Sequence, residues 1–464
     1  GGGDGGRGGS DGGGRRSFPS SHTLPRTGEA RSSISSSRSS SSSSAENSRK
    51  HTRALTVSVA VAALLLCFAA LLSGLAGLWK WQDVFPYRGG TFNASKNCRA
   101  VHTGPEEPCS NILESTCFDR TRCLGGGAGG GGGAEGNLLS VYVHDETCSM
   151  KSSSDVVVSF MGEAVPSMLS RAAGAFRQAA ESRGVLAATP AEACIVVYVV
   201  PSKGECVSQT PTWGKGKNHL LVDMNDQTRE QRSRLDHRAM FAEANMRPCY
   251  FRYGYDIAIP LLAKSIFHNM PGIAPQDRKY FATFKGSLYL SGNGFPERTA
   301  VRNLGDAAAN ESSVVVVEKC QTRHDEHLQS RNVDLCEGLQ REYDKTDYSD
   351  LMNTTFALVP AGRSPATYRL GEALSAGAIP VFIHQNFVKP FPGKIPWSTF
   401  SFSFPAEEAP RIIGTLRAVP VEKLAKMQAT ALKVFDSYFG RDMNGTVHTT
   451  LDILEERLSF RGRS

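Results

Sequence analysis

The stretch FALVPAGRSPATYRLGEALSAGAIPVFI, residues 356–383, contains the pattern that decides the fold. Its first apolar run, Phe356–Val359, has the length of a buried strand, and the prolines and glycine that follow require a loop. Ser364 stands as an N-cap before a proline, which predicts a helix that runs to Ala376. Residues 378–383 form a second apolar run. A strand, a helix and a strand in this order predict parallel strands, with ligands at their carboxyl ends.

Polar side chains cluster at the start of this predicted helix. Arg363 precedes it, and Thr367 and Arg369 lie in its first turn and a half. Unpaired backbone N–H groups and the helix dipole favour a phosphate at this end. Glu372 lies on the same face as Arg369, where a carboxylate accepts hydrogen bonds from paired sugar hydroxyls. The pattern predicts a nucleotide-sugar site, and the alternative is a solvated helix face of arginine and glutamate.

These residues resemble the donor-site signature of the exostosins, glycosyltransferase family 47, in which an arginine-rich loop leads into an R-x-x-E-A-L helix. The resemblance extends upstream through FATFKGSLYLSGNGFPERTAVRNL, reaches CFDRTRC at Cys117 and ends near Tyr438. It is closer to the animal heparan-type exostosins than to the plant wall branch. It implies a GT-B fold of two Rossmann-like, doubly wound α/β domains, an inverting mechanism and a UDP-sugar donor.

Alternating strand and helix patterns along the chain also predict a doubly wound α/β architecture. A helix that starts at Pro296 carries Arg298 in its first turn, and this residue matches an arginine in the corresponding exostosin loop. We expect Arg298 to reach the phosphates from a second helix N-terminus, and a surface arginine is the alternative. The other predicted strands and an amphipathic helix lie, in chain order, at 138–143, 166–183 (the helix), 193–200, 220–222, 280–285 and 314–318.

The net charge of +7 is not a nucleic-acid signal, because residues 1–53 hold nine Lys/Arg and only four Asp/Glu. This Gly- and Ser-rich segment lacks the apolar content for a core, so we predict a disordered cytoplasmic tail. Residues 54–78 carry no charge and are long enough to span a bilayer. With Trp79 they predict a signal-anchor at 54–79 that places the rest of the chain in the lumen. By analogy with Golgi glycosyltransferases, we expect a single-pass type II Golgi membrane protein.

Four segments are predicted after the anchor. They are a stem, an N-terminal acceptor-side α/β domain, a C-terminal donor-binding α/β domain with a closing helix, and a C-terminal tail, at residues 80–116, 117–278, 279–440 and 441–464. The sequence shows no second transferase domain of the kind that animal heparan polymerases carry. We therefore do not expect these residues alone to polymerise a disaccharide repeat.

Cysteine usage supports the lumenal placement. Cys67 lies in the apolar segment, and the ten cysteines beyond it are an even number, as a disulfide-bonded domain requires. Two local pairs are predicted, Cys320 with Cys336 and Cys117 with Cys123, and the second matches a CFDxxxC element of the exostosins. N-glycosylation sequons begin on the predicted lumenal side at Asn93, Asn310, Asn353 and Asn444.

Inverting sugar transfer needs a stabilised leaving diphosphate, a deprotonated acceptor hydroxyl and alignment of the two reactants. Arginines 298, 363 and 369 supply positive charge for the diphosphate. No D-x-D triplet occurs in the sequence, so we expect neither a metal nor another cofactor. The candidate bases are Asp145, His219 and Asp256, polar residues beside predicted strands of the acceptor-side domain. The sequence does not choose between them.

The sequence therefore predicts an enzyme that transfers a sugar from a UDP-sugar to a glycan or glycoprotein acceptor. Glucuronic acid, galactose, xylose and arabinose donors all occur in the family. The alternatives are a non-catalytic exostosin-like subunit that supports a partner transferase, as a homodimer or heterodimer, and a sugar-binding protein. Arg363, Arg369 and Glu372 favour the enzyme. Ala361 stands where the animal proteins have an additional arginine, which favours the subunit.

Overall fold

The computed structural model describes residues 115–124, 138–144, 159–160, 163–200, 207, 210–224, 238–248, 250–292, 294–321, 330–362, 364–384, 387–440 and 442–459. The predicted tail, the signal-anchor and the stem up to residue 114 lie outside these ranges. Within the described ranges, no helix is both long enough and apolar enough to cross a membrane.

The acceptor-side domain contains a five-stranded parallel sheet with the order β1-β4-β5-β6-β7. Nearly every residue of these strands is buried, which is why they read as continuous apolar runs. Strands β4 to β7 follow one another on one side of β1, whereas residues 185–187 pair in parallel with Val141 on its other edge. The chain therefore reverses at β1, and the doubly wound prediction is confirmed for this sheet. The elements of this domain are α2 (Thr121–Leu124), β1 (Val141–Val143), the antiparallel pair β2 (Ser159–Phe160) and β3 (Glu163–Ala164), α3 (Val165–Ser182), β4 (Ile195–Val199), β5 (His219–Asp223), β6 (Met240–Glu243) and β7 (Ile257–Ala258).

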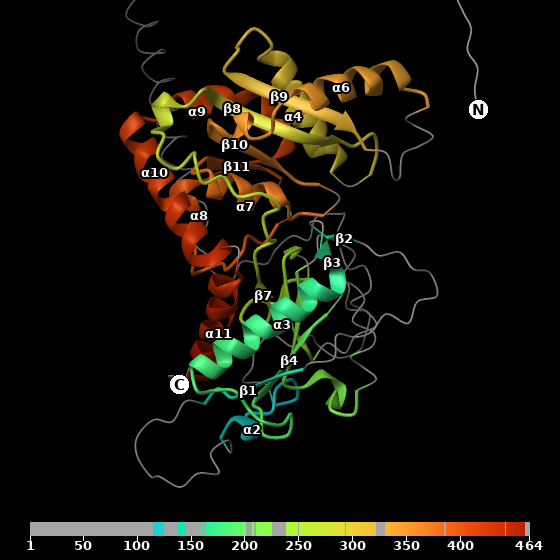
Figure 1. The fold of residues 1–464 in the computed structure, drawn as a ribbon, viewed down its shortest axis with the longest axis vertical. Coiled ribbons are helices and arrows are strands. Elements are labelled where there is room, and N and C mark those ends of the chain that lie inside the picture. The colour runs from blue at the N-terminus through green and yellow to red at the C-terminus, as the bar shows by residue number, and fades with distance from the viewer. Residues whose placement is uncertain are drawn as a thin grey trace, which may run out of the picture. The chain divides into compact units, whose positions relative to one another are not determined.

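The donor-binding domain contains a second five-stranded parallel sheet, with the order β12-β11-β10-β8-β9. This sheet is doubly wound as predicted, because the chain leaves β8 toward β9 and then returns to the other side of β8 as β10. Right-handed crossovers in opposite directions place α4 and α7 on opposite faces of the sheet (Figure 1). Its elements are β8 (Tyr280–Leu288), α4 (Phe295–Ala307), β9 (Val314–Cys320), α6 (Val333–Lys345), β10 (Thr354–Pro360), α7 (Tyr368–Ser375), β11 (Ile379–Ile383), α8 (Trp397–Phe400), β12 (Phe402–Phe404) and α9 (Ala409–Arg417).

The β-α-β unit predicted at residues 356–383 is confirmed, with β10 and β11 parallel and in register from Phe356↔Ile379 to Pro360↔Ile383. The predicted start of its helix is wrong. Thr367 is the N-cap of α7, and its hydroxyl accepts the backbone N–H of Arg369 at 3.4 Å. Ser364 and Pro365 remain in the loop. The next backbone N–H, that of Ala366, donates to the side chain of Asn245 in the acceptor-side domain and is not capped by Ser364.

The closing helix is also confirmed. Helix α10 (Val421–Val434) continues into a π-helical turn, Phe435–Phe439, and buries Leu424, Met427 and Ala431 at the predicted spacing. It packs against α7 and β11 of the donor-binding domain.

The tail predicted at residues 441–464 is wrong, because Asn444–Ser459 form a helix, α11, that packs on α3 (Figure 1). Arg457 donates to the carbonyl of Tyr255 at 2.6 Å, and Arg183 pairs with Asp452 at 2.7 Å. The chain therefore returns to the acceptor-side domain at its end. The helix was missed because several of its buried positions are threonines, which have a low helix propensity.

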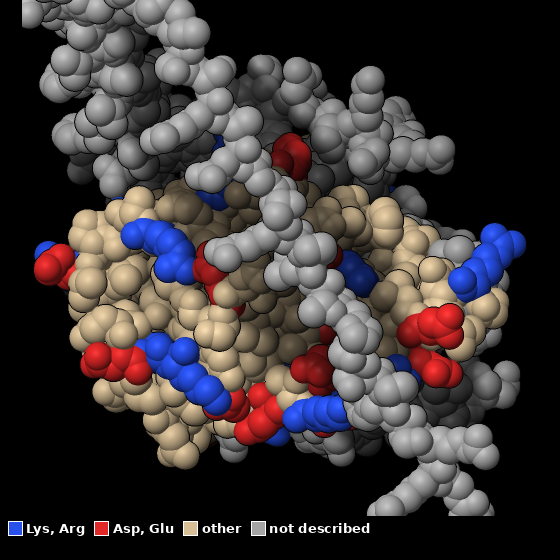
Figure 2. All heavy atoms as spheres, turned by 90° about the horizontal axis from the view of Figure 1, so that it is seen from above, with Lys and Arg blue, Asp and Glu red and all other residues tan. Residues whose placement is uncertain are grey.

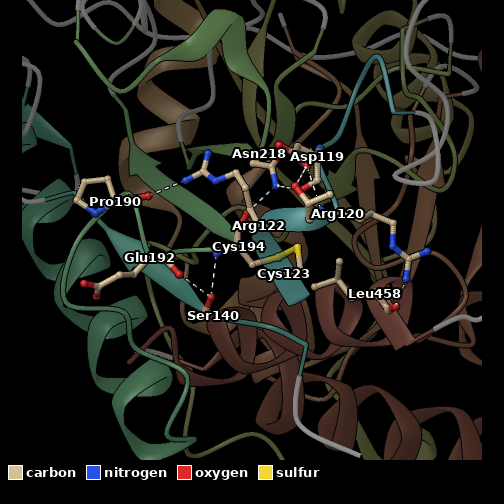
Figure 3. Close-up of a disulfide and its surroundings, with 11 residues drawn as sticks. Asp119, Arg120, Arg122, Cys123, Ser140, Pro190, Glu192, Cys194, Asn218 and Leu458 are labelled. Carbon is tan, nitrogen blue, oxygen red and sulfur yellow. Dashed lines mark hydrogen bonds between the residues drawn. A yellow bond between two sulfur atoms is a disulfide. The ribbon is translucent and has the colours of Figure 1, made fainter. Parts of the chain in front are cut away.

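The structure corrects one predicted disulfide and confirms the other. Cys123 bonds to Cys194, 71 residues away, and thereby fastens α2 to the start of β4 (Figure 3). Because Cys123 is bonded to Cys194, the predicted pairing of Cys117 with Cys123 is wrong. The Cys320–Cys336 bridge is present and joins the end of β9 to α6. The Cys320–Cys336 pair could be predicted because the two cysteines are close in sequence. Cys194 is distant in sequence and reaches α2 only through the tertiary fold.

Three of the four predicted glycosylation sites lie among the described residues. Asn310 and Asn444 are exposed, and Asn353 is half-buried. The Asn353 side chain accepts the backbone N–H of Lys279 at 3.2 Å, and the Asn444 amide donates to Asp442 at 2.8 Å. The geometry therefore favours Asn310 as an acceptor of a glycan.

The turn between α7 and β11 requires glycine. Gly377 has φ = +68°, and a Cβ on it would lie 3.2 Å from both Nη2 of Arg278 and Cδ2 of Leu432. Gly377→Ala should lower the free energy of unfolding by about 1–2 kcal/mol or more, measured by chemical denaturation. As a control, Gly414→Ala places a methyl group in open space on α9 and should stabilise by about 0.5–1 kcal/mol. Equal effects of the two substitutions would contradict this assignment.

Candidate functional site

The strands β8 and β10 separate toward their carboxyl ends. Their pairing runs from Thr354↔Tyr280 to Ala357↔Thr283 and then stops, although both strands continue. The sheet order reverses between these two strands, and open α/β sheets bind ligands at such a reversal, beyond the carboxyl ends of the strands. The candidate donor site is therefore the crevice between β8 and β10, bordered by the loops that follow them.

Two buried arginines span the gap between the separated strands. Arg369, on α7, donates to the carbonyls of Leu358 in β10 (2.9 Å) and Thr283 in β8 (2.8 Å). Nearer the carboxyl ends, Arg298, on α4, donates to the carbonyls of Ala361 (2.9 Å) and Ser287 (3.2 Å). The arginines thus pair with backbone carbonyls that have no partner across the gap.

Arg298 fits the predicted contact with phosphate. It is buried, and burial lowers the pKa of its guanidinium, which nonetheless stays charged because the normal value is so high. Nη2 makes no hydrogen bond to the described residues and lies 3.5 Å from the position of a Cβ on Gly362. The surface-arginine alternative is therefore wrong. The charge faces the loop that follows β10.

The backbone of the two bordering loops is in direct contact. Gly294 is the N-cap of α4 with φ = +81°, and a Cβ on it would lie 2.4 Å from the carbonyl oxygen of Gly362. Only glycine allows this approach. The crevice therefore meets the N-terminus of α4 beside backbone atoms, an environment that suits phosphate.

Arg369 has a different place from the predicted one. Its guanidinium makes four hydrogen bonds: to the Leu358 carbonyl, to the carbonyl and hydroxyl of Thr283, and to the Tyr348 hydroxyl at 3.2 Å. Since arginine has five N–H groups, one remains. The structure thus does not support Arg369 as the main phosphate ligand. It holds the crevice open and contributes positive charge.

Glu372 is buried beside Arg369, so the alternative of a solvated helix face is wrong. One of its carboxylate oxygens accepts a hydrogen bond from the Tyr348 hydroxyl. Burial raises the pKa of Glu372 and also that of Tyr348. Arg369, Tyr348 and Glu372 form a chain of hydrogen bonds in which the tyrosine orients the carboxylate predicted to hold ribose. Of the other predicted donor residues, Thr367 caps α7 and Arg363 lies outside the described residues.

The structure does not favour two of the three predicted bases. Asp256 is fully buried and accepts hydrogen bonds from the backbone and guanidinium of Arg252, with the closest contact at 2.6 Å. His219 lies at the start of β5, away from the carboxyl edge, with Nδ1 2.6 Å from the carbonyl of Lys217. Burial lowers its pKa to about 4. Both lie at the amino ends of strands, His219 at the start of β5 and Asp256 directly before β7, and Asp145 lies outside the described ranges.

Two acidic residues at the carboxyl ends of β5 and β6 were missed from the sequence. Asp223 ends β5 and Glu243 ends β6, the two are paired in the parallel register, and both are buried. Two residues further on, the side-chain oxygen of Asn245 accepts the backbone N–H of Ala366 at 3.1 Å. In the sequence, an acidic residue ends the apolar runs of both β5 and β6, and this pattern could have indicated the edge.

The family comparison agrees with this geometry. The model of the exostosin GT47 domain matches residues 137–419, which include both sheets and the crevice. The chain belongs to the exostosin GT47 family. It is 31% identical over 273 residues to Exostosin-1 of Drosophila melanogaster, a match that covers 56% of this chain and 34% of that protein. It is 29% identical over 296 residues to Exostosin-1c of Danio rerio, covering 58% and 39%.

The chain thus matches about a third of the length of these exostosins, and the predicted closeness to the animal heparan-type branch is confirmed. Among solved structures, trehalose-6-phosphate synthase OtsA is similar with a TM-score of 0.35 and 11% identity, covering 63% of this chain and 77% of that one. The fold assignment rests on the two parallel sheets themselves.

A titratable carboxylate lies beside Arg298. Glu318 of β9 is paired in register with Gly286, over which the Arg298 guanidinium lies, and burial raises the pKa of Glu318 to about 7. A carboxyl with a raised pKa binds its proton more tightly in the folded state. The free energy of unfolding should therefore fall as pH rises from about 4.5 to 7, by roughly 3 kcal/mol.

Denaturation of the parent protein and of Glu318→Gln across this pH range tests the assignment. The variant should lose this part of the pH dependence, whereas Glu337→Gln, at an exposed position on α6, should keep it. A Glu318→Gln variant with the parent's pH profile would show that Glu318 titrates normally.

Proposed function

We propose that this member of the exostosin family transfers a sugar from a UDP-sugar to a glycan or glycoprotein acceptor, with inversion and without a metal. The glycosyltransferase class follows from the family, and the rest of the proposal rests on the crevice. We also propose that the enzyme is a Golgi type II membrane protein, on the strength of the apolar segment at 54–78.

The observation that supports an anionic donor is an excess of buried positive charge. Arg298 and Arg369 are both buried, and neither forms an ion pair with a carboxylate among the described residues. Both guanidinium groups lie against Phe284, with centroid distances of 4.9 and 5.4 Å. Buried charges are costly unless they are paired. A diphosphate at the crevice would supply the missing negative charge.

The same charges suit the leaving group. When the bond from the sugar to the diphosphate breaks, negative charge grows on the diphosphate oxygens. Arg298 and the N-terminus of α4 are fixed before the reaction, so they stabilise this charge without reorganisation. The absence of a D-x-D triplet from the sequence is the reason to propose that protein charges perform this task without a metal.

For the base we propose Asp223 or Glu243, at the acceptor-side edge that meets the donor loop through Asn245. A carboxylate there would take the proton of the acceptor hydroxyl as this oxygen attacks the sugar carbon from the side opposite the diphosphate. Asp145 also follows a strand of the same sheet and stays a prediction, since no described geometry tests it.

A non-catalytic exostosin-like subunit is the second candidate, because Ala361 replaces an arginine expected from the resemblance. Ala361 is buried, and its carbonyl accepts a hydrogen bond from Arg298. A subunit of this kind binds UDP without transferring sugar, whereas a sugar-binding protein needs no UDP. UDP calorimetry and transfer assays therefore distinguish the three functions.

The donor site is tested by Glu372→Ala. Loss of hydrogen bonds to a charged group costs roughly 1.5–3 kcal/mol, so UDP should bind about tenfold more weakly or worse in calorimetry. Glu337→Ala removes an exposed carboxylate of the same type and should leave the UDP affinity unchanged. If Glu372→Ala melts like the parent protein and binds UDP equally well, the ribose site lies elsewhere.

The base is tested by Glu243→Gln and Asp223→Asn, which keep the shape and remove the charge. Substitution of the base should lower kcat by about 10²–10⁴-fold and leave the Kd of UDP unchanged. Asp256→Asn is the matched control, because it breaks a buried ion pair and should lower the melting temperature. Full turnover in both edge variants would remove them from consideration and leave Asp145.

A further inference from the structure

Glu297 lies in the first turn of α4, directly before Arg298 of the crevice. Its Oε2 atom is buried and makes no hydrogen bond to the described residues. Burial raises the pKa of this carboxyl group, whereas the backbone N–H of the same residue and the charges of Arg298 and Arg247 lower it. These electrostatic effects weaken with distance, so the carboxylate lies close to three sources of positive charge. It does so at a helix end that favours a phosphate.

No hydrogen bond or salt bridge from either arginine fixes this carboxylate within the described part of the chain. Two other N–H groups near the start of α4 already have partners, since Phe295 donates to the carbonyl of Gly292 and Arg298 to that of Gly294. A phosphoryl group carries more negative charge and more acceptor oxygens than a carboxylate. A diphosphate that enters the crevice should therefore displace the carboxylate of Glu297.

Arg247 belongs to the acceptor-side domain and approaches this helix end from the domain junction. The two residues before it contact the donor-binding domain. The side chain of Asn245 accepts the backbone N–H of Ala366 at 3.1 Å. The carbonyl of Met246 accepts the backbone N–H of Val388 at 3.0 Å. These contacts hold the backbone next to Arg247 at the loops that follow β10 and β11.

The side chain of Arg247 is available to a ligand. It is half-buried, and its guanidinium makes no hydrogen bond or salt bridge to the residues that the structure describes. A guanidinium group has five N–H donors in a planar arrangement that matches phosphate oxygens. Arg247 therefore places unused donors near the N-terminus of α4, opposite the buried Arg298.

We propose that Arg247 is a further diphosphate-binding residue, supplied by the acceptor-side domain, and that Glu297 is the negative charge that the diphosphate replaces. This role rests on the proposed UDP-sugar transfer and adds a residue to its donor site. The bound diphosphate contacts Arg298 from the donor-binding domain and Arg247 from the acceptor-side domain, so it holds the two domains together. Because Glu297 competes for the same positive charges, it weakens UDP binding and favours release of the product UDP.

The test measures the Kd of UDP and of uridine by calorimetry for the parent protein, Arg247→Gln and Glu297→Gln. Arg247→Gln should bind UDP about tenfold more weakly, because it loses hydrogen bonds between charged groups. Glu297→Gln should bind UDP about threefold to tenfold more tightly, because the diphosphate no longer has to displace a negative charge. Uridine has no phosphate, so both variants should bind it as the parent protein does.

Arg341 and Glu337 provide matched controls, because they form an exposed pair on α6 at 3.8 Å. Arg341→Gln and Glu337→Gln remove the same charges from the protein and should leave the Kd of UDP unchanged. A general effect of net charge on UDP binding would appear in these variants as well.

Several results would overturn the proposal. If Arg247→Gln binds UDP like the parent protein, or loses UDP and uridine equally, Arg247 is not a diphosphate ligand. If Glu297→Gln lowers the melting temperature and keeps the parent's Kd, the carboxylate only stabilises the first turn of α4. A parent protein that binds no UDP would refute the proposed function itself, and this result is obtained before any variant is compared. If Arg247→Gln fails to fold, Arg247→Lys keeps the charge without the planar donors and should still weaken UDP binding, by about threefold.

Discussion

The separation of β8 from β10 is the constraint on which the rest of the structure depends. Parallel strands that stop pairing leave backbone carbonyls without partners, and in a buried sheet this is costly. Arg369 donates hydrogen bonds to the carbonyls of Thr283 and Leu358. Nearer the carboxyl ends of the strands, Arg298 donates to the carbonyls of Ser287 and Ala361. The crevice is thus a consequence of sheet order, held open by two long side chains from helices on opposite faces.

The two arginines place two positive charges close together in the interior, and buried charges need a negative partner. Glu318 does not neutralise Arg298 fully, since burial raises the pKa of Glu318 to about 7. The folded protein therefore carries positive charge where a ligand would bind. On the face drawn in Figure 2, the visible blue and red side chains are interspersed. Such a site favours a small anion that can enter a crevice over an extended polyanion.

The parts of this design that are local in sequence could be predicted from the sequence. The strands β10 and β11 and the core positions of α10 follow from apolar runs and helical spacing alone. The Thr367 cap could not be predicted, because it depends on Asn245 binding Ala366 across the domain boundary. The Cys123–Cys194 bridge and the return of α11 to the acceptor-side domain depend in the same way on contacts between distant segments.

The candidates for a catalytic base were harder to predict for the same physical reason. A polar residue next to a predicted strand can contact a ligand only if it lies at the carboxyl edge of the folded sheet. Asp256 and Glu243 are both buried carboxylates of one domain, yet Arg252 neutralises the first, while the second lies on the edge that meets the donor loop. A base must reach the acceptor hydroxyl across the same junction that positions the donor. Asn245 accepts the backbone N–H of Ala366, and the carbonyl of Met246 accepts that of Val388, so residues 245–246 contact the segments after both β10 and β11. In the proposed transfer these contacts would align the donor with the acceptor.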